Sequence, residues 1–180
     1  MLLYAICLYP LLCTLDKQLT GLGRGRRRAR TSVIVYADDV TILVTSPSDI
    51  QKIQDALHTY EEATGAKLNT PKSQSVPIIS WNTSIRIMDI PYYNETTMLG
   101  LHITNTIQTS SIRSWTLTTV KIRAQAQEAY YRELTLDKRI HYVHNHLMAR
   151  VWYLAQIYSP LEVCLSQLNS TIAWFLWRGT

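Results

Sequence analysis

Two adjacent carboxylates, Asp38 and Asp39, are the side chains of this sequence best suited to chemistry. They follow Tyr36 and Ala37 in the stretch S-V-I-V-Y-A-D-D-V-T-I-L-V-T, residues 32–45. Hard cations such as Mg²⁺ take oxygen ligands and bind through one or two carboxylates together with substrate phosphates. Two such ions about 4 Å apart can stabilise both the attacking and the leaving oxygen of an in-line displacement. The pair therefore indicates a divalent-metal site for phosphoryl transfer.

The residues on either side of the two aspartates predict the element that positions them. Residues 33–36 read V-I-V-Y and residues 40–44 read V-T-I-L-V, which favours two strands with a tight turn at Ala37-Asp38-Asp39. We expect a β-hairpin that carries both carboxylates at its tip. Successive side chains on extended backbone point to opposite faces, so one aspartate should bind metal directly and the other more weakly. The alternative is an ordinary turn, which Asp favours because it bonds to nearby backbone.

A strongly basic segment precedes this hairpin. Residues 23–30 read G-R-G-R-R-R-A-R, and we call them the arginine-rich loop because glycines and like charges disfavour regular structure. The loop could contact phosphates, serve as a nuclear-localisation signal or simply be solvated. The candidate nucleic-acid-binding residues are Arg24, Arg26, Arg27, Arg28 and Arg30.

Composition places the chain among folded proteins. Of its 180 residues 47% are hydrophobic, which is enough for a core, and the net charge of +5 suits a polyanionic partner. The apolar opening, residues 1–15, has no preceding basic region and no small-residue cleavage site, and Asp16 and Lys17 end it too early for a membrane span. We therefore expect no membrane partner. The three cysteines, Cys7, Cys13 and Cys164, show no metal-binding spacing and are typical of reduced core thiols, so we expect an intracellular protein, in the nucleus or cytoplasm.

Several helices follow from spacing and capping signals. Ser46-Pro47, with Asp49 in the first turn, should start a helix that ends near Gly65. Ser159-Pro160-Leu161-Glu162 is a capping box for a last helix, with Pro160 at its first position. Residues 137–158 carry apolar side chains at helical spacing, within a region that is helical from about Ser111. Short apolar runs in residues 68–79 and 85–103 predict short strands.

Three segments in the same order resemble one family. Tyr36-Ala37-Asp38-Asp39 resembles the Y-x-D-D palm signature of reverse transcriptases, in the form typical of non-LTR (LINE-type) retrotransposons. Residues 63–73, A-T-G-A-K-L-N-T-P-K-S, resemble the fourth palm motif. Met98-Leu99-Gly100-Leu101 resembles the primer-grip motif, with Met in place of the usual aromatic residue. Residues 1–15 resemble the palm helix that follows the nucleotide-pocket motif.

The resemblance implies a fold and its partners. The expected fold class is α+β: a partial polymerase palm, residues 1–108, with an antiparallel sheet, the Y-A-D-D hairpin and packed helices, followed by an α-helical thumb-like region, residues 109–180. The implied activity is RNA-directed DNA synthesis by two-metal nucleotidyl transfer. The implied cofactor is Mg²⁺, two ions in the complete enzyme. The implied partners are an RNA template, a DNA primer and deoxynucleoside triphosphates.

The resemblance also assigns roles to residues. Asp38 would hold metal and Asp39 would assist it, while Tyr36 and Ala37 would shape the floor beneath the primer terminus. Lys72 would protonate or neutralise the leaving pyrophosphate. Taken without the resemblance, Lys72 could equally be a surface lysine beside a proline turn. Leu99 and Gly100 would help to seat the primer strand.

Some parts of the family pattern are not found in this sequence. The first palm motif supplies a further metal-binding aspartate, but the one acidic residue before Tyr36 is Asp16, followed by lysine. The nucleotide-pocket motif Q-G-x-P-x-S and the fingers are not found either. We therefore expect a chain that is inactive alone and needs the N-terminal fingers and palm sequence as a partner. The alternative is a non-catalytic relic, or a basic nucleic-acid-binding module that retains the fold.

Overall fold

The computed structural model describes residues 2–23, 30–37, 39–78 and 81–177. These form two compact units, one of Met1–Ser75 and Asn82–Pro91 and one of Val76–Trp81 and Tyr92–Thr180. The strands are short and pair only in antiparallel two-stranded sheets among the described residues, β1 with β2, β3 with β4 and β5 with β6. Helices and small antiparallel sheets occur together, which confirms the predicted α+β class.

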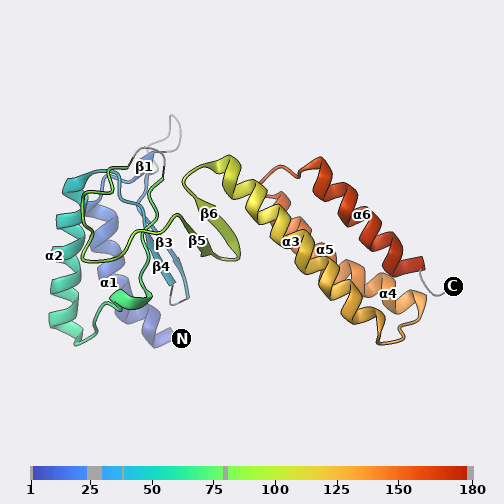
Figure 1. Cartoon of the computed structure of the whole chain (residues 1–180). Helices are drawn as coiled ribbons and strands as arrows, with labels where there is room; N and C mark the ends of the chain where they lie inside the picture. The colour runs from blue at the N-terminus through green and yellow to red at the C-terminus, as the bar shows by residue number, and fades with distance from the viewer. Residues whose placement is uncertain (1, 24–29, 38, 79–80, 178–180) are drawn as a thin grey trace. The chain divides into compact units, whose positions relative to one another are not determined.

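The first unit holds the hairpin that carries the aspartates. Its elements in chain order are α1 (Leu2–Gln18), β1 (Leu22–Gly23), β2 (Arg30–Thr31), β3 (Val33–Tyr36), β4 (Asp39–Ile42), α2 (Pro47–Thr64) and the 3₁₀ turn η1 (Thr70–Lys72). Helices α1 and α2 lie side by side, and β3 contacts α1 (Figure 1).

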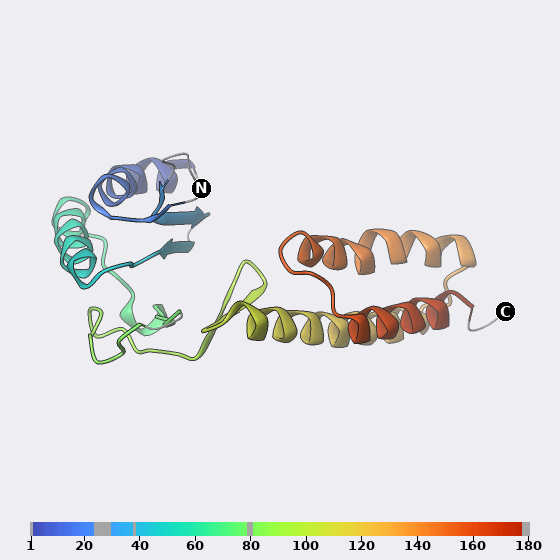
Figure 2. The same cartoon turned by 90° about the horizontal axis from the view of Figure 1, so that it is seen from above.

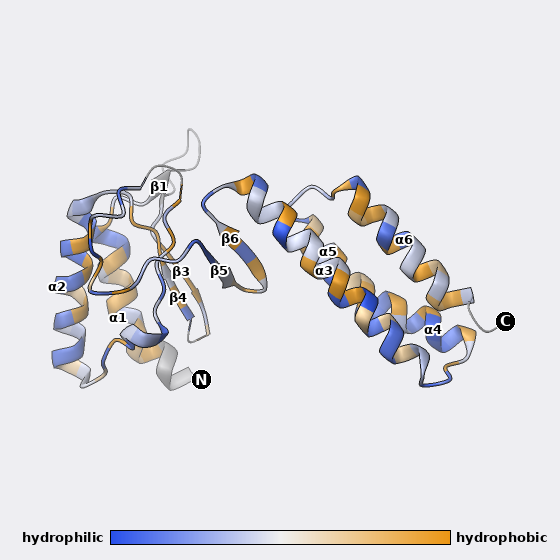
Figure 3. Ribbon diagram, in the orientation of Figure 1, coloured by the Kyte–Doolittle hydropathy of each residue, from blue (hydrophilic) through white to orange (hydrophobic). Residues whose placement is uncertain are grey.

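A small apolar core holds this unit together. Helix α1 buries Leu8, Leu11, Leu15 and Leu19, whose spacing places them on one face of a helix. They pack with Ile53 and Ala56 of α2 and with partly buried Val33 and Ile42 of the hairpin. Figure 3 shows the matching pattern, with α1 mostly hydrophobic and α2 mostly hydrophilic on its outer side. The core therefore fixes the hairpin at the end away from its turn.

The predicted limits of α2 are confirmed. Ser46 has an extended backbone at the N-cap, and Pro47 occupies the first turn, where its missing N–H costs nothing. At the other end Gly65 has φ of 71°, and its N–H donates to the carbonyl of Glu61 at 2.8 Å. Glycine adopts this left-handed conformation without steric cost, so the helix ends there.

The second unit is a β-hairpin followed by helices. Its elements are β5 (Glu95–Met98), β6 (Leu101–Thr104), α3 (Ile107–Tyr130), α4 (Leu136–Tyr142), the π turn η2 (Val143–Leu147), α5 (Met148–Ala155) and α6 (Glu162–Trp177). Helix α3 contacts both α5 and α6, and α4 contacts α6. Figure 2 shows α4, η2 and α5 as one continuous rod. The buried centre includes Trp115, Ile122, Leu147, Leu168 and Phe175.

Three predicted elements differ from the structure. The described part of residues 68–79 contains the turn η1 and no strand, because Pro71 lacks an N–H and the Asn69 side chain caps the turn instead. The predicted helix 137–158 is interrupted by η2 and ends at Ala155. The last helix begins at Glu162 rather than at Pro160, with the first helical carbonyl supplied by Leu161.

The compact units also group β5 and β6 with the helices that follow them. The predicted domain limits, residues 1–108 and 109–180, remain a prediction. None of the helices in the described part of the chain has the length and apolar character that a membrane span requires.

Candidate active site

The predicted hairpin is present, with one difference at its tip. Strands β3 and β4 pair in a register that places Tyr36 opposite Asp39, so Ala37 and Asp38 connect them. Asp39 is thus the first residue of β4 and not a turn residue. Ala37 has φ of 54°, a left-handed conformation that is unfavourable for a residue with a side chain. Asp38 lies outside the described residues.

The end of the hairpin near its turn is exposed. Tyr36 is 64% exposed and Asp39 is also exposed, whereas Val33 and Ile42 at the opposite end pack against the core. The end of the hairpin away from its turn is also held by a hydrogen bond, in which the N–H of Leu43 donates to the carbonyl of Ser32 at 2.8 Å. A carboxylate is therefore presented to solvent from a hairpin that is held at its base, which is the preorganisation that a metal or substrate site requires.

Asp16, the acidic residue upstream of the hairpin, has a structural role. Its Oδ1 accepts a hydrogen bond of 3.0 Å from the hydroxyl of Ser32, which is buried at the start of the hairpin. This bond connects α1 to the hairpin. In the ranges that the structure describes, no three His, Cys, Asp or Glu side chains come together in a way that could hold a metal ion.

Asp49 is a second anchor of the hairpin, and sequence reasoning assigned it only to the first turn of α2. Its side chain is fully buried and accepts hydrogen bonds from the hydroxyls of Thr20 at 3.2 Å and Thr45 at 3.0 Å. Lys52 Nζ lies 3.2 Å from its Oδ1. Asp49 thus joins the end of α1 and the segment leaving β4 to the start of α2. No sequence pattern signals the contact with Thr20, which lies 29 positions away.

The electrostatics of Asp49 follow from these contacts. Burial by itself would raise the pKa of this carboxyl. The hydrogen bonds outweigh burial and lower the pKa from its ordinary value of 3.8 to about 2. The donors, in decreasing order of effect, are Lys52, Thr45, Ser46 and Thr20. Asp49 is therefore an ionised structural residue at neutral pH.

Lys72 ends the turn η1, and its side chain is exposed. Asn69 Oδ1 accepts a hydrogen bond of 3.2 Å from the backbone N–H of Lys72. Just before it, the N–H of Leu68 donates to Glu61 Oε1 at 2.7 Å, which fastens the segment to α2. The strand expected within residues 68–79 is wrong, and the turn η1 in its place is positioned by Asn69 and Glu61. Asn69 belongs to the segment that resembles the fourth palm motif, residues 63–73, whereas no sequence pattern indicates the contact of Glu61.

Leu99 and Gly100 form the turn between β5 and β6 in the second unit. Their φ values are 51° and 81°, the pair of left-handed conformations that a type I′ hairpin turn requires. Gly100 adopts this conformation readily, whereas Leu99 does so at a steric cost. The hydroxyl of Tyr153 donates to the Leu99 carbonyl at 2.8 Å. The site residues of the second unit are therefore held in a strained turn by a contact from α5.

The arginine-rich loop lies between two paired strands. Leu22 and Gly23 of β1 pair with Thr31 and Arg30 of β2, so the backbone of Arg30 is part of a small sheet. Four of the candidate residues, Arg24, Arg26, Arg27 and Arg28, lie outside the described residues. The loop therefore connects β1 to β2 in the first unit, and Ser32 separates β2 from β3.

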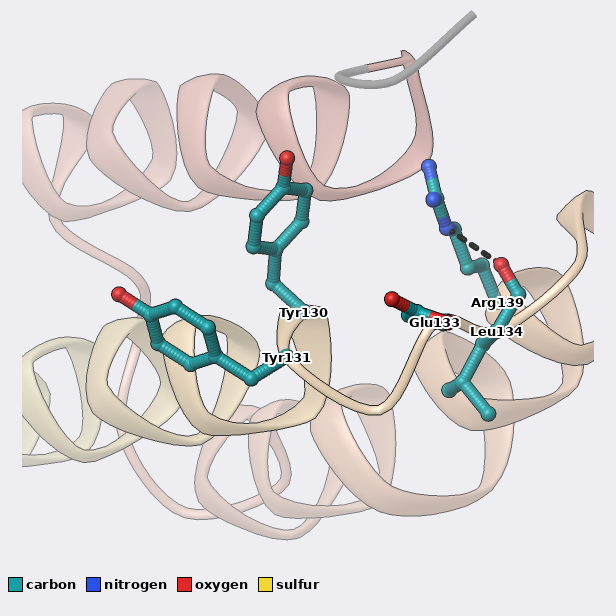
Figure 4. A pocket seen from close by; sticks show the side chains of 5 residues that line it. All are labelled: Tyr130, Tyr131, Glu133, Leu134 and Arg139. Atoms are coloured by element: carbon teal, nitrogen blue, oxygen red, sulfur yellow. Dashed lines mark hydrogen bonds between the residues drawn. The ribbon is translucent and has the colours of Figure 1, made fainter.

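The second unit also holds a cavity of about 320 Å³ (Figure 4). It is lined by Tyr130, Tyr131, Glu133, Leu134 and Arg139. The guanidinium of Arg139 donates to the backbone carbonyls of Leu134 at 2.9 Å and Leu176 at 3.2 Å. Because Arg139 joins the start of α4 to the end of α6, we interpret it as a structural residue.

Comparison with known proteins agrees with this arrangement. Residues 1–103 match the family described as reverse transcriptase (RNA-dependent DNA polymerase), a match that covers the β3–β4 hairpin, Lys72 and the turn of Leu99 and Gly100. The chain is also 25% identical, over 192 aligned residues, to the "Transposon TX1 uncharacterized 149 kDa protein" of Xenopus laevis. The alignment covers 98% of this chain and 14% of the length of that relative. Proteins of this family generally use a divalent metal ion.

The family match covers more than half of the chain, and the relative is a transposon protein. The predicted resemblance to the reverse transcriptases of non-LTR retrotransposons is confirmed. This chain belongs to the reverse transcriptase (RNA-dependent DNA polymerase) family.

Proposed function

We propose that this chain supplies the carboxylate hairpin and the primer-seating turn of a retrotransposon reverse transcriptase. The reaction would be RNA-templated DNA synthesis, in which the 3′-hydroxyl of a primer attacks a deoxynucleoside triphosphate. The observation that carries the proposal is the exposed Asp39 at the end of a base-anchored hairpin, inside the segment that matches the family. The reaction partners would be met in the nucleus or the cytoplasm.

The donor chemistry at this hairpin suits a hard cation. Asp39 offers an exposed carboxylate, and no ion pair to it is found within the described residues. Oxygen donors of this kind are what Mg²⁺ prefers. Asp38 would be the direct ligand and Asp39 the weaker one, and two bound Mg²⁺ ions would stabilise charge on the attacking and leaving oxygens. Tyr36 and Ala37 would form the surface beneath the primer terminus.

Other residues would act on the rest of the substrate. Lys72 would supply a proton or a positive charge to the leaving pyrophosphate, and Asn69 would set the backbone from which it extends. Leu99 and Gly100 would seat the primer strand. The arginine-rich loop would contact phosphates of the template or primer.

The chain alone is expected to be inactive. Catalysis with two metal ions draws carboxylates from more than one strand, and Asp16 is held by Ser32 at the base of the hairpin. The activity would therefore require sequence that provides a further aspartate-bearing strand and a nucleotide pocket, as fingers and palm segments do.

A chimera provides the test. Residues 1–180 would replace the corresponding segment of an active reverse transcriptase of the same family, and primer extension would be measured on primed RNA with Mg²⁺ and deoxynucleotides. We expect synthesis by the chimera and none after Asp38→Asn with Asp39→Asn. Asp55→Asn, on the exposed side of α2, is the matched control and should leave synthesis unchanged. A folded chimera without activity, or activity that survives the double substitution, would favour a non-catalytic relic or binding module.

A further inference from the structure

The β5–β6 hairpin is fastened to helix α3 by two buried serines. The N–H of His102 donates to Ser114 Oγ at 3.1 Å, and the N–H of Thr104 donates to Ser110 Oγ at 2.9 Å. The two serines are one helical turn apart, and both are buried. Two outward N–H groups of β6 are thus satisfied by α3, which fixes the strand against the helix.

The turn of this hairpin is fixed separately, by α5. The hydroxyl of Tyr153 donates to the carbonyl of Leu99 at 2.8 Å, although the two residues are 54 positions apart. Leu99 has φ of 51°, and a branched side chain in this conformation persists only where surrounding contacts hold it. Tyr153 is itself placed by its neighbours in α5, Val151 and Leu154, which are buried in the core of the second unit.

We propose that Tyr153 is a positioning residue for the turn of Leu99 and Gly100. The hydroxyl keeps Leu99 in its left-handed conformation and joins the turn to the helical unit. Together with Ser110 and Ser114 it makes β5, β6 and the helices one body. The role of the turn in seating a primer rests on the proposed function above, whereas the hold of Tyr153 on the turn does not.

The first test is local and uses the 180-residue chain labelled for nuclear magnetic resonance. Tyr153→Phe removes one hydroxyl and keeps the ring, which is 41% exposed. Hydrogen exchange of the Leu101 amide, beside the turn, should accelerate about fivefold, the change expected for one hydrogen bond. The carbonyl carbon resonance of Leu99 should also shift. Exchange within α3 and α6 should stay unchanged, because their packing does not involve this hydroxyl.

Tyr131→Phe is the matched control. Tyr131 is in the same unit and 81% exposed, so loss of its hydroxyl should alter neither the Leu99 resonance nor exchange at Leu101. The proposal is overturned if Tyr153→Phe leaves the turn unchanged, or if it accelerates exchange equally throughout the second unit.

The second test concerns the primer and uses binding of a duplex with a recessed 3′ end, compared with unprimed single-stranded RNA. Tyr153→Phe should lower the preference for the recessed end by at most about fivefold, because one hydrogen bond is lost. Tyr131→Phe should leave that preference unchanged. If Tyr153→Phe loosens the turn but leaves the preference for the recessed 3′ end unchanged, the claim that this turn positions the primer is overturned. If the wild-type chain binds the recessed duplex and the single-stranded RNA equally well, that result would count against the proposed function. The hydrogen-exchange data would still decide whether Tyr153 holds the turn.

Discussion

Asp49 should make the first unit sensitive to acid, and Asp49→Asn should remove that sensitivity. The carboxylate joins α1, the exit of β4 and the start of α2 through Thr20, Thr45 and Lys52. The substitution keeps the shape and an acceptor oxygen but removes the charge. We therefore expect the variant to fold and to be less stable at neutral pH.

The magnitude follows from the pKa of Asp49, which is lowered from 3.8 to about 2. Each pKa unit of difference is worth about 1.4 kcal/mol, so the ionised carboxylate contributes roughly 2.5 kcal/mol to the free energy of unfolding. Because the folded pKa is the lower one, this contribution is complete above the unfolded pKa of 3.8 and is lost as the pH falls towards about 2. Asp49→Asn should lower stability by roughly 2.5 kcal/mol at pH 7 and have little effect near pH 2.

The assay must separate the two units. Hydrogen exchange of peptides from α2 reports the first unit, whereas all five tryptophans lie in the second unit, so that tryptophan fluorescence reports its unfolding. Asp49→Asn should destabilise α2 and leave the fluorescence transition in place. Asp55→Asn, an exposed change in the same helix, should alter stability by at most about 0.5 kcal/mol. Equal stability of wild type and Asp49→Asn at pH 7 would refute the reasoning.

Three further predictions concern activity and binding. The isolated chain with primed RNA, Mg²⁺ and nucleotides should give no product above background, and robust incorporation would show that no further carboxylate is needed. Nucleic-acid binding should be weak and steeply dependent on salt concentration. Replacing all five arginines of the arginine-rich loop with serine should make the salt dependence of binding, measured by fluorescence anisotropy, less steep. Unchanged binding by this variant would show that the loop is merely solvated. In the active chimera, Lys72→Ala should slow single-turnover primer extension by roughly 10²–10⁴-fold. Asn69→Ala, which removes the cap of η1, should slow extension less. A larger effect from Asn69→Ala than from Lys72→Ala would contradict the role given to Lys72.

The features that could be predicted from the sequence are those with local causes. The β-branched runs predict β3 and β4, and Ser46, Pro47 and Gly65 predict both ends of α2. The family resemblance is carried by short segments and is confirmed by the match of residues 1–103.

The remaining features depend on partners distant in the sequence. Tyr153 contacts Leu99 across 54 positions, and Asp49 accepts a bond from Thr20 across 29. Neither pairing leaves a periodic or spaced signal. The apolar residues near Leu68 predict a short strand, but Asn69 and Pro71 together favour the capped turn η1 that the structure has. The π turn η2 interrupts a helix whose apolar spacing continues through it.

The role of the hairpin can be tested most directly by the Mg²⁺ dependence of primer extension in the chimera, compared between Asp38→Ala and Asp39→Ala. If Asp38 is the direct ligand, its loss should abolish synthesis at every Mg²⁺ concentration. Loss of Asp39 should only impair synthesis, and raised Mg²⁺ should partly restore it, because the weaker ligand acts mainly through the local field. Equal loss from both substitutions, or undiminished synthesis with Asp38→Ala, would contradict the assignment of these two carboxylates.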